Sequence, residues 1–243
     1  MRNGGRILAA ILRDLMAMAK PGLKTKELSV RAVQLLKDNN VEPSFLNYKG
    51  YPDVICLAVN DQAVHTPGSD HELQEGDLLK LDFGVVLNGL HTDSARSIIV
   101  SDLPEDEQKK KYVKERKLIQ AVKEGLEAGI KQCVPGNTVG DISAAIQARI
   151  DKDGFSILRE LGGHGIGHIL HDEPFIPNVG RAGEGPRLQS GMTIAIEPIA
   201  SLGKPGIKDG ADGFSYETTD GALAAHWEHT VAITDEGPEV LTE

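Results

Sequence analysis

The first forty residues show two consecutive helical patterns of apolar positions. In the first pattern, over residues 1–20, one face is formed by Ile7, Leu8, Ile11, Leu12, Leu15 and Met18. Pro21-Gly22 ends this helix, and Thr25 is expected to cap a second helix that runs to about Asn39-Asn40. The chain therefore begins with two amphipathic helices, and a β-rich region follows them.

Residues 79–100 show the pattern of two strands joined by a tight turn. Asn88-Gly89 is the strongest short signal for a two-residue hairpin turn. This turn places two aspartates on one face of the ladder beside two of the smallest residues, in the pairs Asp82–Ala95 and Gly84–Asp93. The aspartates then lie diagonally, about 7–8 Å apart at the backbone. Taken alone, the pattern allows a metal between the carboxylates or two solvated aspartates on an edge hairpin.

The helical pattern returns in the second half of the chain in the same register. Residues 118–133 are again helical, Pro135-Gly136 ends that helix, and residues 139–153 form another. An overlay without gaps aligns Pro21-Gly22 with Pro135-Gly136, Glu27-Leu28-Ser29 with Asp141-Ile142-Ser143, and Asn40-Val41 with Gly154-Phe155. Helix stops of this kind are common, but the uninterrupted register favours two related halves over coincidence.

The repeat predicts one domain over residues 1–243 with α/β halves at about 1–100 and 115–243. The charged segment 101–114 is the expected linker, a solvated loop followed by a helix start. Because hairpins rather than helical crossovers join the strands, the sheet should be antiparallel.

Composition narrows the class of protein. With 40% hydrophobic and 26% charged residues, the chain is of the soluble globular class, and its formal charge of −10 argues against a nucleic-acid partner. Cys56 and Cys133 are too few for a disulfide framework and predict two reduced thiols. Neither a signal peptide nor a membrane span is visible, so we expect a cytoplasmic protein.

Further chemistry lies in three segments of the second half. Residues 161–174 hold three histidines among four glycines, namely His164, His168 and His171. Glycine lets a backbone approach a ligand closely, which favours a site over ordinary core histidines. Glu197 ends a hydrophobic strand and Glu228 lies within another, where an unpaired carboxylate is costly to bury. Alternatively, each glutamate could lie at a solvent-exposed strand end. The presence of both glutamates together with Asp82 and Asp93 favours a metal centre.

The chain resembles the methionine aminopeptidase family, in its short type I form, over nearly its whole length. The residues that match that family's five metal ligands in order and spacing are Asp82, Asp93, His164, Glu197 and Glu228. The resemblance implies the α+β pita-bread fold, in which two pseudo-symmetric halves build a curved antiparallel sheet with helices on its outer face. It also implies a monomer that removes the N-terminal methionine of nascent polypeptides, near the ribosome, where the second residue is small.

Four carboxylates at close range need compensating charge. Two divalent cations balance them, and a water between two such ions becomes hydroxide at neutral pH. An oxygen-rich donor set with one imidazole suits Co, Mn, Fe or Zn. By resemblance, Asp93 and Glu228 bridge the two ions, Asp82 completes one of them, and the other is completed by His164 and Glu197.

The resemblance also implies roles in catalysis and substrate binding. Glu197 would assist as general base, while His65 and His171 would orient the substrate amide and stabilise the tetrahedral intermediate. The expected lining of the methionine pocket consists of Tyr48, Tyr51, Cys56, His65, Leu170, His171 and Phe214. The chain departs from the family at Thr66-Pro67-Gly68 and at Leu170, where an aromatic residue is frequent, and both differences should alter the rim or width of the pocket.

Two alternative functions compete with this interpretation. A Xaa-Pro aminopeptidase or prolidase shares the fold and the ligand set, but the segment from Tyr48 to Tyr51 favours methionine. A binding protein that has lost catalysis need not keep the ligands, yet all five are present. The sequence therefore predicts a dinuclear metal-dependent methionine aminopeptidase.

Overall fold

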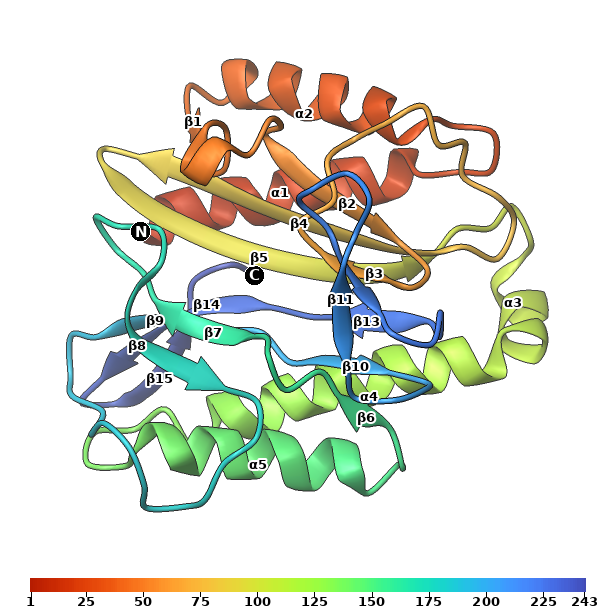
Figure 1. Ribbon diagram of the computed structural model, residues 1–243. Coiled ribbons are helices and arrows are strands. Elements are labelled where there is room, and N and C mark those ends of the chain that lie inside the picture. The colour runs from red at the N-terminus through yellow and green to blue at the C-terminus, as the bar shows by residue number, and fades with distance from the viewer.

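A computed structural model describes residues 1–243 of the protein (Figure 1). The helices occupy Arg2–Met18 (α1), Thr25–Asp38 (α2), Glu105–Lys111 (α3), Val113–Ile130 (α4) and Val139–Asp151 (α5), with a short 3-10 turn at Tyr48–Gly50 (η1). Both predicted pairs of long helices are therefore present, and α3 is an additional short helix within the charged linker. None of the helices is long and apolar enough to cross a membrane.

The strands form four antiparallel sheets. The first contains β1 (Glu42–Pro43), β2 (Ile55–Val59), β4 (Leu78–Leu87) and β5 (Leu90–Ile99). Two three-stranded sheets contain β3 (Gln62–Val64) with β11 (Ile207–Asp209) and β12 (Tyr216–Thr218), and β6 (Ser156–Ile157) with β10 (Ile199–Ser201) and β13 (Ala224–His226). The fourth has the order β15 (Gly237–Val240), β14 (His229–Thr234), β9 (Thr193–Ile196), β7 (Gly162–Gly165) and β8 (Asp172–Pro177). The predicted α+β class with antiparallel pairing is confirmed.

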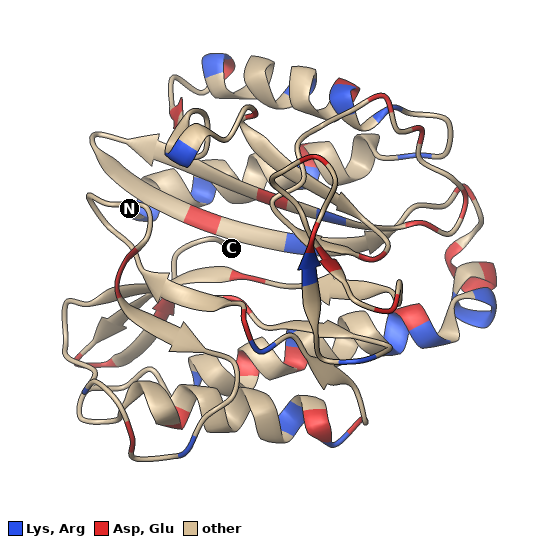
Figure 2. Ribbon diagram, viewed as in Figure 1, with Lys and Arg blue, Asp and Glu red and all other residues tan.

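The long helices form the outer layers and the sheets lie between them (Figure 1). On one side, α1 and α2 pack on the sheet of β2 and β4, and on the other α4 and α5 pack on the strands of the second half. The apolar face of α1 is buried as its spacing predicts, with Leu8, Ile11 and Leu15 at most 1% exposed. Figure 2 shows acidic positions on β4 and β5 in the middle of the molecule, between these two helical layers.

Matched features begin the second helix of each pair. The Glu27 carboxylate accepts a hydrogen bond from the Lys24 backbone N–H at 2.9 Å, and the Asp141 carboxylate accepts one from that of Thr138 at 2.7 Å. The glycines before both helices, Gly22 and Gly136, have φ of 88° and 93°. Residues 114 positions apart in the predicted overlay thus share both conformation and hydrogen bonding.

The expectation that Thr25 caps α2 is wrong. Thr25 is the first residue of the helix itself, and Lys24 holds the capping position. The Thr25 hydroxyl instead accepts a hydrogen bond from the backbone N–H of Ser69 at 2.9 Å, which ties the start of α2 to a distant loop. This tertiary contact uses the oxygen that a cap would have turned toward the helix.

The hairpin of β4 and β5 has the predicted register. Its pairs include Asp82 with Ala95 and Gly84 with Asp93, and both turn residues, Asn88 and Gly89, have positive φ as a type I′ turn requires. Alternation along β4 sends Leu79, Leu81, Phe83 and Val85 into the core beneath α1 and α2. Asp82 therefore points to the opposite face, toward the second half of the chain.

Candidate metal centre

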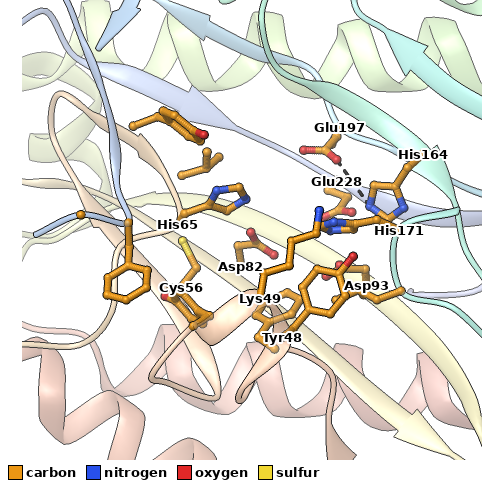
Figure 3. A pocket seen from close by; sticks show the side chains of 17 residues that line it. Tyr48, Lys49, Cys56, His65, Asp82, Asp93, His164, His171, Glu197 and Glu228 are labelled. Carbon is orange, nitrogen blue, oxygen red and sulfur yellow. Dashed lines mark ion pairs between the residues drawn. The ribbon is translucent and has the colours of Figure 1, made fainter. Parts of the chain in front are cut away.

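The five predicted metal ligands meet in one cavity between the two halves. Its volume is about 300 Å³, and its walls include all five side chains, namely Asp82, Asp93, His164, Glu197 and Glu228. Two come from the β4–β5 hairpin, one from β7, one follows β9 and one lies between β13 and β14. Figure 3 shows the labelled side chains turned toward one another. Residues up to 146 positions apart thus form one cluster.

Glu228 lies in an interruption between two strands rather than within one continuous strand as expected. Its backbone N–H donates to the carbonyl of Ala95 at 3.0 Å. Its carbonyl accepts from the Ser94 hydroxyl at 2.7 Å and from the Arg96 guanidinium at 2.6 Å. Because the backbone of Glu228 bonds to β5, its side chain is held beside Asp93 on that strand.

The potential donor atoms form overlapping groups. Those of Asp82, Asp93 and Glu228 lie within 4.8 Å of one another, as do those of His164, Glu197 and Glu228. A third group of the same size joins Asp93 to His164 and His171. Three residues, namely Asp93, Glu228 and His164, belong to two groups each, whereas Asp82 and Glu197 belong to one each. Of these three, Asp93 and Glu228 each share one group with Asp82 and another with His164.

The carboxyl groups carry no compensating protein cation. Asp82, Asp93 and Glu228 are at most 8% exposed, and none of them forms an ion pair with lysine or arginine. Burial raises the pKa of Asp93 to about 7. Burial, together with the neighbouring negative charges, raises the pKa of Asp82 and Glu228 well above their usual range. One oxygen of Asp82 is buried without any hydrogen-bond partner. Such a cluster fits divalent cations, since they restore the charge balance and satisfy the orphaned oxygen.

His164 presents one ring nitrogen to this cluster. Its Nδ1 lies 2.8 Å from the carbonyl of Gly165 and donates to it, which leaves Nε2 as the acceptor. Nε2 lies 3.7 Å from the Glu197 carboxylate, and burial lowers the pKa of the ring. A neutral imidazole fixed through Nδ1 is the form in which histidine binds metals.

His65 and His171 line the same cavity without hydrogen bonds from their rings to protein groups. The His171 ring contacts the Tyr48 ring edge-on, with centroids 5.0 Å apart, and the His164 ring at 4.3 Å. Burial lowers the pKa of His171 to about 3, so its ring is neutral. His65 has φ of 61°, an uncommon conformation for a residue other than glycine, which sets its ring against Tyr216. His168 does not join them, because it is exposed and its Nδ1 bonds to Gly89.

An apolar recess continues from the carboxylates. The Tyr51 ring contacts the Phe214 ring edge-on at 5.9 Å, and its hydroxyl donates to the Ile55 carbonyl at 3.0 Å. Cys56 and Leu170 also line the cavity, and each is 2% exposed. The predicted pocket residues are thus brought together beside the carboxylate cluster.

Sequence reasoning missed several residues at this site, among them His226 and Lys49. His226 is 1% exposed, and its Nε2 lies 3.5 Å from Oε2 of Glu197. Its spacing of two from Glu228 places both on one face of an extended segment, and that signal could have identified it. Lys49 also lines the cavity, and its position between Tyr48 and Tyr51 was the available signal.

Buried carboxylates around one imidazole, open to an apolar recess, are the arrangement of a metal-dependent hydrolase. Residues 1–235 match Metallopeptidase family M24, and the chain belongs to this family.

The chain is similar to the methionine aminopeptidase of Clostridium perfringens, with 40% identity over 242 residues that cover 100% of this chain and 94% of the relative. The crystal structure of methionine aminopeptidase from Rickettsia prowazekii has a TM-score of 0.94 at 34% identity, covering 100% of this chain and 95% of that one. The prolidase from Pyrococcus furiosus shares the fold, with a TM-score of 0.76 at 22% identity over 62% of its chain. The predicted family and pita-bread fold are confirmed.

Proposed function

We propose that this protein is a metal-dependent aminopeptidase that removes methionine from the N-termini of nascent proteins and peptides. The observation that carries the proposal is the direct continuity between the carboxylate cluster and the recess of Tyr51 and Phe214 in one cavity. Membership of the metallopeptidase family and similarity to methionine aminopeptidases support it. The prolidase likeness, at 22% identity, concerns the fold alone.

Two divalent ions, of Co, Mn, Fe or Zn, would occupy the cluster. Asp93 and Glu228 are the candidates for shared ligands, because each belongs to the donor group that contains Asp82 and to a donor group that contains His164. Asp82 would complete one position, and His164 with Glu197 the other. Bound divalent ions would lower the pKa of a coordinated water and polarise the peptide carbonyl.

The remaining steps fall to side chains of the cavity. Glu197 would accept the proton of the attacking water and pass it to the leaving amine, since its carboxylate borders the cluster. His171 is neutral and free of protein hydrogen bonds, so its N–H could donate to the negative charge that develops on the carbonyl oxygen. His65, on the other wall of the cavity, would hold the substrate amide.

The recess suits an unbranched apolar side chain. Its walls of Tyr51, Phe214, Cys56 and Leu170 are largely apolar, and methionine can adapt to such a surface without strain. The hairpin face on one side and the histidine segment on the other enclose the next residue, so that residue should be small. A free α-amino group would bind among the carboxylates and ions, which limits cleavage to the first residue.

We further propose that residues 1–243 act as one catalytic domain and as a monomer, because both halves line the same cavity. Cys56 and Cys133 are free and buried, as in a reducing compartment, which agrees with action in the cytoplasm on chains that leave the ribosome.

The decisive experiment compares Met-Ala-Ser, Leu-Ala-Ser and Ala-Pro-Ser peptides with metal-loaded protein. We expect cleavage of Met-Ala-Ser to be fastest, and no cleavage of its N-acetylated form. Faster cleavage of Ala-Pro-Ser would assign the protein to the proline-specific branch, and no cleavage of any peptide would favour a binding protein.

A further inference from the structure

Lys49 is the one lysine or arginine among the seventeen residues that line the catalytic cavity. It belongs to η1, between the aromatic residues Tyr48 and Tyr51, and has φ of 49° and ψ of 30°. This left-handed conformation is uncommon outside glycine and asparagine. The turn therefore directs the lysine side chain toward the cavity, and Figure 3 shows it extended toward His171.

The Lys49 ammonium has no carboxylate partner within 4 Å, although four acidic side chains line the same cavity. Its Nζ lies 5.3 Å from the centroid of the Tyr48 ring, a cation–π distance. The Tyr48 ring in turn contacts the His171 ring. Tyr48 therefore lies between the Lys49 ammonium and the histidine that is proposed to face the scissile carbonyl. Tyr48 thus supports an unpaired positive charge at a fixed place beside the reacting bond.

The charges in the cavity suggest a role for the Lys49 ammonium in binding substrate. Two divalent ions would neutralise the four carboxylates, and Lys49 would then have no carboxylate of the cavity left to pair with. Tyr48 and Lys49 line the same cavity as the recess of Tyr51 and Phe214, so a peptide whose methionine side chain filled that recess would pass these two residues if its following residues left the cavity on their side. Each extended residue spans about 3.3–3.6 Å. The third residue of the substrate is therefore within reach of a lysine side chain.

We propose that Lys49 is a specificity-determining residue that binds a carboxylate of the substrate just beyond the scissile bond. This carboxylate is an acidic side chain at the third position or the free C-terminus of a tripeptide. The proposal rests on the proposed aminopeptidase function and adds a substrate class to it. An exposed ion pair of this kind corresponds to a preference of about two- to fivefold in kcat/KM, which high salt should reduce.

The test compares kcat/KM for four peptides: Met-Ala-Glu-amide, Met-Ala-Gln-amide, Met-Ala-Ser and Met-Ala-Ser-amide. The first pair reports on an acidic side chain and the second on a free C-terminus. Lys49→Met keeps the length and the contact with Tyr48 but removes the charge, while Lys49→Arg keeps the charge. Lys37→Met is the matched control, because Lys37 is an exposed lysine of α2 outside the cavity.

We expect the wild type, Lys49→Arg and Lys37→Met to prefer the acidic peptide, mainly through KM, and Lys49→Met to lose the preference. The same ratio in Lys49→Met as in the wild type would overturn the role of Lys49 while leaving the aminopeptidase function in place. Failure of the wild type to cleave any of the four peptides would count against the function instead. Calorimetric binding of the same peptides then decides the Lys49 proposal without turnover.

Discussion

Nε2 of His226 lies 3.5 Å from Oε2 of Glu197, and both nitrogens of this buried imidazole lack a hydrogen-bond partner. A buried ring without partners is costly unless it serves a neighbour, and Glu197 is the acceptor within reach. We therefore expect His226 to orient the Glu197 carboxylate toward the metals. Outer-shell partners of this kind are typically worth about 10–100-fold in metal affinity.

His226→Leu should accordingly weaken binding of the ion near Glu197 by about tenfold or more, measured by calorimetric titration of the metal-free protein. His226→Gln retains a side-chain N–H and should restore most of the affinity. Equal affinities in the wild type and the leucine variant, with both proteins folded, would show that the contact has no orienting role.

The overlapping donor groups predict an order among ligand substitutions. Asp93→Asn and Glu228→Gln should reduce activity and metal content more than Asp82→Asn, because Asp93 and Glu228 each belong to two of the donor groups and Asp82 to only one, so that both would be shared ligands in the proposed two-ion arrangement. Metal content after dialysis and kcat/KM with Met-Ala-Ser are the measurements. Similar losses in all three variants would contradict the shared roles of Asp93 and Glu228.

Removal of metal should make stability depend on pH through Asp93. Burial raises the folded-state pKa of its carboxyl from 3.8 to about 7. The resulting stabilisation is full below pH 3.8 and is lost as the pH rises through about 7. Chelated protein should therefore lose stability over this window, whereas metal-loaded protein should not, because divalent ions bind the deprotonated carboxylates.

Thermal unfolding of both forms across that window measures the effect. Asp93→Asn removes one of the titrating groups and should weaken the pH dependence of the chelated protein, while Asp82 and Glu228, whose pKa values are also raised, continue to titrate. A chelated wild type whose stability rises over the same window would contradict the prediction.

The sequence predicted the turn and the register of the β4–β5 hairpin correctly, and its bounds to within one residue, because its determinants are local. Asn88-Gly89 fixes the turn, and strict alternation then decides that Asp82 and Asp93 share a face. The repeat of helix stops was equally local, since Gly22 and Gly136 each need a positive φ.

Features that depend on contacts between distant segments were not predictable in the same way. Thr25 is a residue type that often caps helices, but its hydroxyl accepts a hydrogen bond from the backbone N–H of Ser69 instead. The spacing of the histidine segment could not separate His168, which bonds to Gly89, from His171, which enters the cavity. The spacing of His226 from Glu228 could suggest that both face the site, but the contact of His226 with Glu197 depends on the folded position of β13 near the end of β9.

His171→Ala should lower kcat strongly while metal content stays near the wild-type value. The ring lines the cavity as a neutral group without protein partners, so its loss removes a donor to the developing oxyanion. Such donors are worth about 10²–10³ in kcat. Because His171 also lies within 4.8 Å of Asp93 and His164, loss of a metal ion in this variant would identify it as a ligand instead.

Leu170 should set the width of the methionine recess. It is 2% exposed and packs with Phe45 and Ile166 at the wall of the cavity, where a larger ring would narrow the space. We expect the wild type to cleave Leu-Ala-Ser with kcat/KM below that of Met-Ala-Ser by about 10–200-fold, the range in which one methylene discriminates. The norleucine peptide, whose side chain has the length of methionine, should be cleaved better than the leucine peptide. Leu170→Phe should increase this discrimination against leucine, and Leu170→Ile, of equal volume, serves as the control. Unchanged ratios in the phenylalanine variant would show that Leu170 lies outside the part of the recess that the first side chain fills.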